Sequence, residues 1–93
     1  MRNYEIAFIV HPDLEDTGYK EVVERVQELV KNTGGTIIKI DQWGRKKLAY
    51  EIRKLTEGQY VFLHTEMDPT MCTDLEHALQ LNESIIRFMI TSN

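Results

Sequence analysis

The chain has 93 residues, of which 42% are hydrophobic and 28% charged, and its formal net charge is −4 at pH 7. These values are typical of one soluble globular domain, predicted to span residues 1–93, and they exclude a disordered tail. The longest apolar run, residues 6–10, is far shorter than the roughly 20 residues of a membrane-spanning helix. Cys72, the single cysteine, cannot form an internal disulfide, so a reducing cytoplasm is the expected setting.

Apolar periodicity predicts the first two elements. Residues 3–10 alternate between apolar and mixed positions, as a strand with one buried face does. Residues 16–33 carry valine and leucine at helical spacing, which predicts a helix with Asp16 or Thr17 as its N-cap. Gly34 is expected at the left-handed position that ends this helix.

The middle of the chain is predicted to form a long hairpin. Residues 36–52 are rich in β-branched and aromatic residues, and a bulge is expected at Gly44, where the alternation falters. A loop over residues 54–58, ending at Gly58, is expected to connect this strand to a third strand over residues 59–67.

The last part of the chain predicts a second helix and a fourth strand. Asp68 and Pro69 are favoured at the N-cap and first helical positions, so a helix is expected over residues 69–81. The final strand is expected over residues 85–91. Three of its residues are expected to face the core: Ile86, Phe88 and Ile90.

This order of elements predicts an α+β, ferredoxin-like βαββαβ fold, a four-stranded antiparallel sheet with two helices on one face. Right-handed crossovers place the first and third strands in the centre. The other face of the sheet stays open. Alternation assigns eleven residues to it: Asn3, Glu5, Ala7, Ile9, Tyr60, Phe62, His64, Glu66, Ile85, Arg87 and Met89.

No residue pattern favours catalysis, so we expect no enzyme, no catalytic residue, no metal site and no cofactor. His11, His64 and His77 lack the spacing of zinc ligands, and no glycine-rich phosphate loop opens a helix. A small enzyme of the same fold, such as an acylphosphatase, would need a phosphate-cradling loop after the first strand. Residues 11–14 contain no glycine for such a loop.

The aromatic residues Tyr60 and Phe62 on the open face allow two interpretations. In RNA-recognition modules, aromatic residues on a central strand stack unpaired bases. Alternatively, the face is an apolar surface that a partner protein covers, and this interpretation is the better supported. Four residues are the candidates for partner contact: Tyr60, Phe62, His64 and Met89.

Positive charge is concentrated on a short segment. Residues 45–54 hold five of the 11 Lys and Arg residues but only one acid, Glu51, so the segment carries +4 and the remaining chain −8. Such a cluster suits contacts with RNA phosphates, which position a protein but read little sequence. The alternative is protection of an exposed sheet edge, where Lys and Arg deter aggregation.

The same segment resembles a family signature. Residues 43–54 read WGRKKLAYEIRK, and this resembles the W-G-R-R-x-L-A-Y-P-I-x-K signature of the ribosomal protein S6 family of the bacterial small subunit. The first twelve residues resemble that family's M-R-x-Y-E…V-x-P opening, and residues 86–89 resemble its I-R-x-M. Two positions depart from the signature, since Glu51 stands where the family usually has Pro and Lys46 replaces an Arg.

The resemblance implies a ribosome-bound, cytoplasmic protein that binds 16S ribosomal RNA as a heterodimer with ribosomal protein S18. A basic partner could supply much of the phosphate contact, which fits the negative net charge. The resemblance implies neither a membrane nor a small-molecule substrate. Together with the charge cluster, it gives seven candidate RNA contacts: Arg2, Arg45, Lys46, Lys47, Arg53, Lys54 and Arg87.

Overall fold

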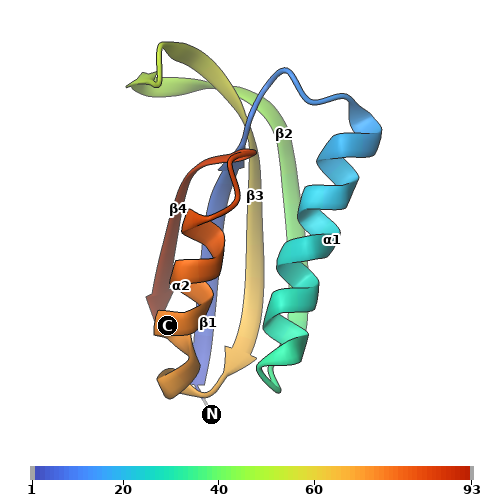
Figure 1. Cartoon of the computed structure of the whole chain (residues 1–93), viewed down its shortest axis with the longest axis vertical. Coiled ribbons are helices and arrows are strands. Elements are labelled where there is room, and N and C mark those ends of the chain that lie inside the picture. The colour runs from blue at the N-terminus through green and yellow to red at the C-terminus, as the bar shows by residue number, and fades with distance from the viewer. Residues whose placement is uncertain (1, 93) are drawn as a thin grey trace.

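The structure, a computed structural model, describes residues 2–92 as one four-stranded antiparallel sheet with two α-helices on one face (Figure 1). The strand order is β2-β3-β1-β4, so the predicted ferredoxin-like fold with β1 and β3 in the centre is confirmed. The elements are β1 (Arg2–Val10), α1 (Asp16–Asn32), β2 (Thr36–Ile52), β3 (Leu55–Met67), a 3₁₀ turn (Pro69–Met71), α2 (Cys72–Gln80) and β4 (Ile85–Ser92).

The core lies between the sheet and the helices. Its largest fully buried side chains come from the two central strands and both helices: Ile6, Phe8, Val10, Val26, Val30, Val61, Leu63, Thr65, Met67, Leu75 and Leu79. Phe88 and Ile90 pack against this cluster from β4, as predicted. Burying each large apolar side chain contributes about 1.5–3 kcal/mol, so the part of the sheet beneath the helices is held mainly by this core.

Helix α1 starts without the predicted side-chain cap. Its N-cap is Glu15, in extended conformation and with no side-chain capping bond, so the expectation of Asp16 or Thr17 is wrong. Its end follows the prediction. Gly34 adopts φ 85°, and its amide donates to the Lys31 carbonyl at 3.0 Å. This bond satisfies one of the carbonyls that a helix end leaves free.

The start of the second helical segment is capped as predicted. The Asp68 carboxylate accepts a hydrogen bond from the Thr70 amide at 3.0 Å, with Pro69 next in the chain. Hydrogen bonds from the amide and hydroxyl of Thr70 hold the pKa of Asp68 below its usual value. The first turn is 3₁₀ before α2 begins at Cys72, which explains why α2 is shorter than expected.

Strand β4 enters the sheet with an irregularity that reverses two predicted positions. The β1–β4 register shifts between Ile9 and Val10, and Val10 pairs with Ile85. Ile85 is therefore in the core, 3% exposed, although the alternation placed it on the open face. Ile86 lies on the open side instead, beside Gly58 and Ile9. The prediction was wrong because a bulge adds one residue to β4 and inverts the alternation before it.

The β2–β3 connection is tighter than predicted. Strand β3 begins at Leu55, which pairs with Ile52, so the turn consists of Arg53 and Lys54 alone. Both turn residues have positive φ, 51° and 63°, as a two-residue turn between right-twisted strands requires. The predicted loop ending at Gly58 is wrong, because Gly58 lies inside the strand, opposite Lys46.

Residues 46–58 form an arm that projects beyond β1 and bends over the open face of the sheet (Figure 1). Strand β2 has 17 residues and β3 only 13, and the β2–β3 register shifts between Ile37 and Lys39, between Gln42 and Gly44, and between Lys47 and Ile52. Extra residues on one strand bend a ladder and increase its twist. The bulge expected at Gly44 is confirmed, with φ 74°.

Gly58 allows the arm to approach the sheet closely. A Cβ atom at this position would collide with Cγ2 of Ile9 and would contact Ile86 and Leu48 at 3.5 Å. Gly58 is buried, and the space above it is filled by these three side chains. A side chain at residue 58 would therefore push the arm away from β1.

We predict that Gly58→Ala destabilises the protein by about 1–3 kcal/mol, the usual range for overpacking a tightly filled site. Chemical denaturation measures the change in the free energy of unfolding. Thr56→Ala, an exposed position two residues earlier in β3, is the control and should stay within about 0.5 kcal/mol of wild type. Equal stability of both variants would show that the arm does not approach Ile9 this closely.

Candidate functional site

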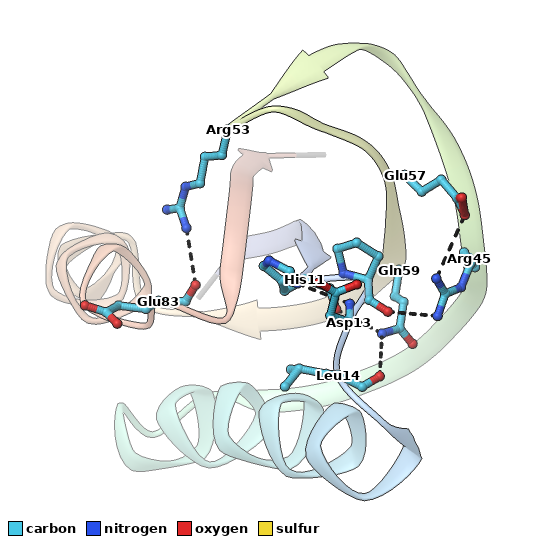
Figure 2. Close-up of polar contacts among 9 residues, drawn as sticks. His11, Asp13, Leu14, Arg45, Arg53, Glu57, Gln59 and Glu83 are labelled. Carbon is cyan, nitrogen blue, oxygen red and sulfur yellow. Dashed lines mark hydrogen bonds and ion pairs between the residues drawn. The ribbon is translucent and has the colours of Figure 1, made fainter.

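Six of the seven candidate RNA contacts gather at the end of the molecule that carries the arm. Arg45 lies at the base of the arm, opposite Gln59, and Lys46, Lys47, Arg53 and Lys54 belong to the arm itself. The sixth candidate is Arg87 in β4, whose guanidinium group lies over the ring of Tyr50 in the arm. Figure 2 shows the arm arching over the sheet, with Arg53 directed toward Glu83 and Arg45 directed toward the loop after β1.

Arg45 ties the base of the arm to the loop after β1. Its Nη2 donates to the carbonyl oxygen of Pro12 at 2.8 Å, and its Nη1 lies 4.0 Å from a carboxylate oxygen of Glu57 (Figure 2). Next to it, Nε2 of Gln59 donates to the His11 carbonyl at 3.1 Å and lies 3.4 Å from the Leu14 carbonyl. The carbonyl groups of this loop are thus bonded by side chains from the base of the arm.

Arg53 and Arg87 join the far end of the arm to the body. Nη1 of Arg53 donates to the carbonyl oxygen of Glu83, in the turn between α2 and β4, at 3.3 Å (Figure 2). The guanidinium carbon of Arg87, on β4, lies 5.2 Å from the centre of the Tyr50 ring. A cation over an aromatic face at this distance is attracted by the ring quadrupole. Each contact crosses from the arm to another part of the chain.

The lysines of the arm differ from its arginines. Lys46, Lys47 and Lys54 are exposed, and none of them forms an ion pair or a side-chain hydrogen bond with any part of residues 2–92. Strand β2 is an edge strand, so its outer side has no neighbouring strand. These ammonium groups are accessible to a ligand.

Arg2 is not part of this group. It lies at the start of β1 and pairs with Met67, at the opposite end of β1 from Val10 and the base of the arm. In Figure 1 the start of β1 and the arm are at opposite ends of the long axis. The seven candidate contacts therefore do not form one continuous patch.

Three of the four candidate partner contacts line a shallow apolar groove of about 140 Å³ on the open face. These residues are Tyr60, Phe62 and Met89, and the groove floor between them includes Ala7 and Ile9. Met89 is 55% exposed. A second hollow of about 250 Å³ continues from this groove beneath the arm, where Leu48, Tyr50 and Ile52 form one wall.

Trp43 covers part of this surface, which the sequence did not predict. Its ring centroid lies 4.6 Å from that of Phe62, with the two ring planes inclined at 49°. Trp43 is the extra residue of the bulge before Gly44, and it is still 59% exposed. The positive φ of the glycine turns the strand here, so the indole packs over its neighbour in β3. The sequence signal that could have indicated this contact was the predicted bulge at Gly44, directly after Trp43, the only tryptophan of the sequence.

His64 lies beside the groove in a polar cluster. Its Nε2 is 3.2 Å from a carboxylate oxygen of Asp41 on β2, and its Nδ1 is 3.7 Å from one of Glu5 on β1. The Glu5 contact follows from the predicted open face, because these two residues pair directly across the strands. The Asp41 contact depends on the β2–β3 register and could not be predicted from alternation.

Residues 2–92 contain neither a metal-binding cluster nor a membrane-spanning helix. Within residues 2–92, no group of three or more His, Cys, Asp or Glu residues is arranged to hold a metal ion. No helix in that range is long and apolar enough to cross a membrane. The exposed cations of the arm and the apolar groove remain the two candidate binding surfaces.

Comparison with known proteins identifies the family. A family model described as ribosomal protein S6 matches residues 3–92. The chain belongs to the ribosomal protein S6 family. The signature that suggested this family, residues 43–54, runs from the bulge in β2 through the whole outer strand of the arm to its turn.

Individual S6 proteins are similar over almost the whole chain. The chain is 42% identical over 91 residues to small ribosomal subunit protein bS6 of Moorella thermoacetica, covering 98% of this chain and 93% of that protein. It is 39% identical over 90 residues to bS6 of a Clostridium botulinum strain, covering 97% and 96%. The crystal structure of 30S ribosomal protein S6 from Thermotoga maritima superimposes with a TM-score of 0.95 at 31% identity, covering 99% of this chain and 87% of that one.

Proposed function

We propose that this S6-family chain is a structural, non-enzymatic component of the small ribosomal subunit, which binds 16S ribosomal RNA together with ribosomal protein S18. Its relatives bear the name of a small-subunit protein, and the similarity extends over nearly all of their length. The observation that carries the proposal is the separation of two surfaces, cations on the arm and an apolar groove on the open face.

The arm is the proposed RNA contact. It gathers a local charge of +4 on a protein whose net charge is −4, so RNA is attracted to one end and repelled elsewhere. Contacts of Lys and Arg with phosphates release condensed counterions, which makes binding strongly salt-dependent. Edge protection alone does not require five cations in ten residues. Arg2 would make a separate contact at the other end of the sheet.

The groove is the proposed contact for the partner protein. Tyr60, Phe62 and Met89 leave apolar area exposed on a sheet face that no helix covers, and exposed apolar patches typically mark interaction sites. His64, with its two carboxylate neighbours, would form part of the polar rim. A basic partner bound here would add positive charge close to the arm and offset the negative charge of the chain.

A stand-alone single-stranded RNA-binding function of the open face has less support. Stacking a base on Phe62 would compete with Trp43, which already packs against that ring at 4.6 Å. This alternative predicts binding to short unpaired RNA without a partner, and loss of that binding in Phe62→Ala. Our proposal predicts neither.

Charge reversal of Arg45, Lys46 and Lys47 together is expected to weaken binding to a 16S ribosomal RNA fragment in the presence of S18. Fewer phosphate contacts release fewer counterions, so the dependence of log K on log salt should become shallower. Filter binding or fluorescence anisotropy over a salt series measures both quantities.

A triple charge reversal on α1 is the matched control. Lys20, Arg25 and Lys31 are exposed on α1, outside the arm, and their reversal changes the net charge by the same amount. This control should retain the wild-type salt slope. An unchanged slope in the arm variant would rule out phosphate contact by the arm.

Met89→Asp is expected to weaken binding of S18, because it places a carboxylate on the apolar groove. Isothermal titration calorimetry should show a loss of roughly tenfold or more, equivalent to about 1.4 kcal/mol. Leu81→Asp is the control, since Leu81 is a still more exposed apolar residue, 72% against 55%, outside the groove. Equal affinities of the two variants would place the partner on another surface.

A further inference from the structure

The cations at the arm fall into two chemical groups. The guanidinium groups of Arg45, Arg53 and Arg87 each make a contact that joins the arm to the body, with carbonyl oxygens at 2.8 and 3.3 Å and a tyrosine ring at 5.2 Å. The ammonium groups of the arm have no such contact within residues 2–92. Net charge and sequence position do not reveal this division, because Arg45 is followed directly by Lys46 and Lys47, and Arg53 by Lys54.

We infer that the arginines position the arm and that Lys46, Lys47 and Lys54 make the contacts with RNA phosphates. The inference rests on the proposed function and specifies which side chains carry it. Arginine is in general the better phosphate ligand, but the guanidinium groups of Arg45 and Arg53 already donate to carbonyl oxygens of the body. The lysine ammonium groups make no such bond within residues 2–92, and an ammonium group binds phosphate as a point charge.

The environment of Arg45 supports its role as a positioning residue. One edge of its guanidinium is bonded to Pro12, and its charge is partly balanced by Glu57 at 4.0 Å. To engage a phosphate with the same donors, it would have to leave a carbonyl that belongs to the loop after β1. Loss of that bond would release the base of the arm.

The turn provides an independent observation. Arg53 and Lys54 both adopt left-handed backbone conformations, φ 51° and 63°, which favour Asn and Gly at these two positions. Two long cationic side chains therefore occupy positions that backbone preference opposes. The contact with Glu83 accounts for Arg53. Lys54 has no partner within the described residues, so its role lies in binding a ligand outside the chain.

The pairing of the strands indicates how the RNA backbone approaches. Lys46 is opposite Gly58 and Lys47 is opposite Glu57, and successive side chains of a strand point to opposite faces. Only the unpaired outer edge of β2 is within reach of both. The phosphates would therefore follow this edge of the arm toward the turn at Lys54, and would not lie across the open face.

The test measures two quantities for matched variants: the thermal midpoint of the free chain, and the salt slope of binding to a 16S ribosomal RNA fragment in the presence of S18. The midpoint is measured without RNA because bound RNA would itself raise it. K46A/K47A should keep the midpoint and reduce the slope by about two units, or one per phosphate contact. R45A and R45K should both lower the midpoint while keeping the slope, because neither side chain carries the guanidinium group that contacts both Pro12 and Glu57. K20A/K31A on α1 should change neither quantity.

The turn variants separate backbone strain from charge. R53N keeps Lys54 and should keep the slope, whereas R53N/K54G should lose about one further unit of slope. The double variant should nevertheless match or exceed the thermal midpoint of R53N, because glycine is favoured at positive φ. Stability and RNA binding then change in opposite directions, which a purely structural role for Lys54 does not allow.

The outcomes that overturn the inference are distinct from failure of the proposed function. If wild type binds RNA in a salt-dependent way but K46A/K47A has the same salt slope, then these two lysines do not contact phosphates. Their remaining role would be to protect the sheet edge from aggregation. A slope reduced by R45A at an unchanged midpoint would make Arg45 a phosphate contact. Absence of salt-dependent binding by the wild-type complex would overturn the proposed function and this inference together.

Discussion

The curvature of the β2–β3 hairpin is the constraint on which the rest of the surface depends. Two strands that continue beyond their neighbours have no core to hold them, and an isolated two-stranded ribbon is marginally stable in water. Here the longer strand lies outside the bend, and its extra residues increase the twist of the ladder. Gly58 removes the one Cβ atom that would prevent the approach to Ile9. The bend then gives the arm a surface to pack against.

That bend divides the open face into two regions. Beneath the arm, Leu48 and Ile9 meet over Gly58, and the guanidinium group of Arg87 lies over the Tyr50 ring. Beyond it, Phe62 and Met89 remain accessible in the groove. The same curvature carries the lysines away from the acidic helices, to the end of the molecule. The proposed RNA surface and the proposed partner surface thus adjoin one another on an acidic protein, with Arg87 at their border.

The sequence was sufficient for the topology, the helix stop at Gly34, the bulge at Gly44 and the cap at Asp68, because each depends on local chemistry. It failed for the features that depend on how the strands pair. The bulge opposite Ile9 exchanged the sheet faces on which Ile85 and Ile86 lie, and nothing in either residue signals it. The turn was predicted at the wrong position because glycine is a typical turn residue, so Gly58 was assigned to the turn. Arginine and lysine are not typical turn residues, and Arg53 and Lys54 were therefore not recognised as the turn.

The same limit applies to the site. Family resemblance identified residues 43–54, and alternation identified the groove. The anchoring of Arg45 and Arg53 on distant carbonyl groups, and the packing of Trp43 on Phe62, required the folded chain. Backbone carbonyl acceptors carry no sequence signal, since every residue has one.

The central claim is that the arm is formed and anchored in the free protein, before RNA or a partner binds. Amide hydrogen exchange of residues 46–57 in the isolated chain tests it most directly, because exchange reports the opening of local structure. The account predicts that the amides paired between β2 and β3 in the arm exchange far more slowly than those of an unstructured peptide. Exchange at unstructured rates across the arm, with the core amides protected, would contradict it.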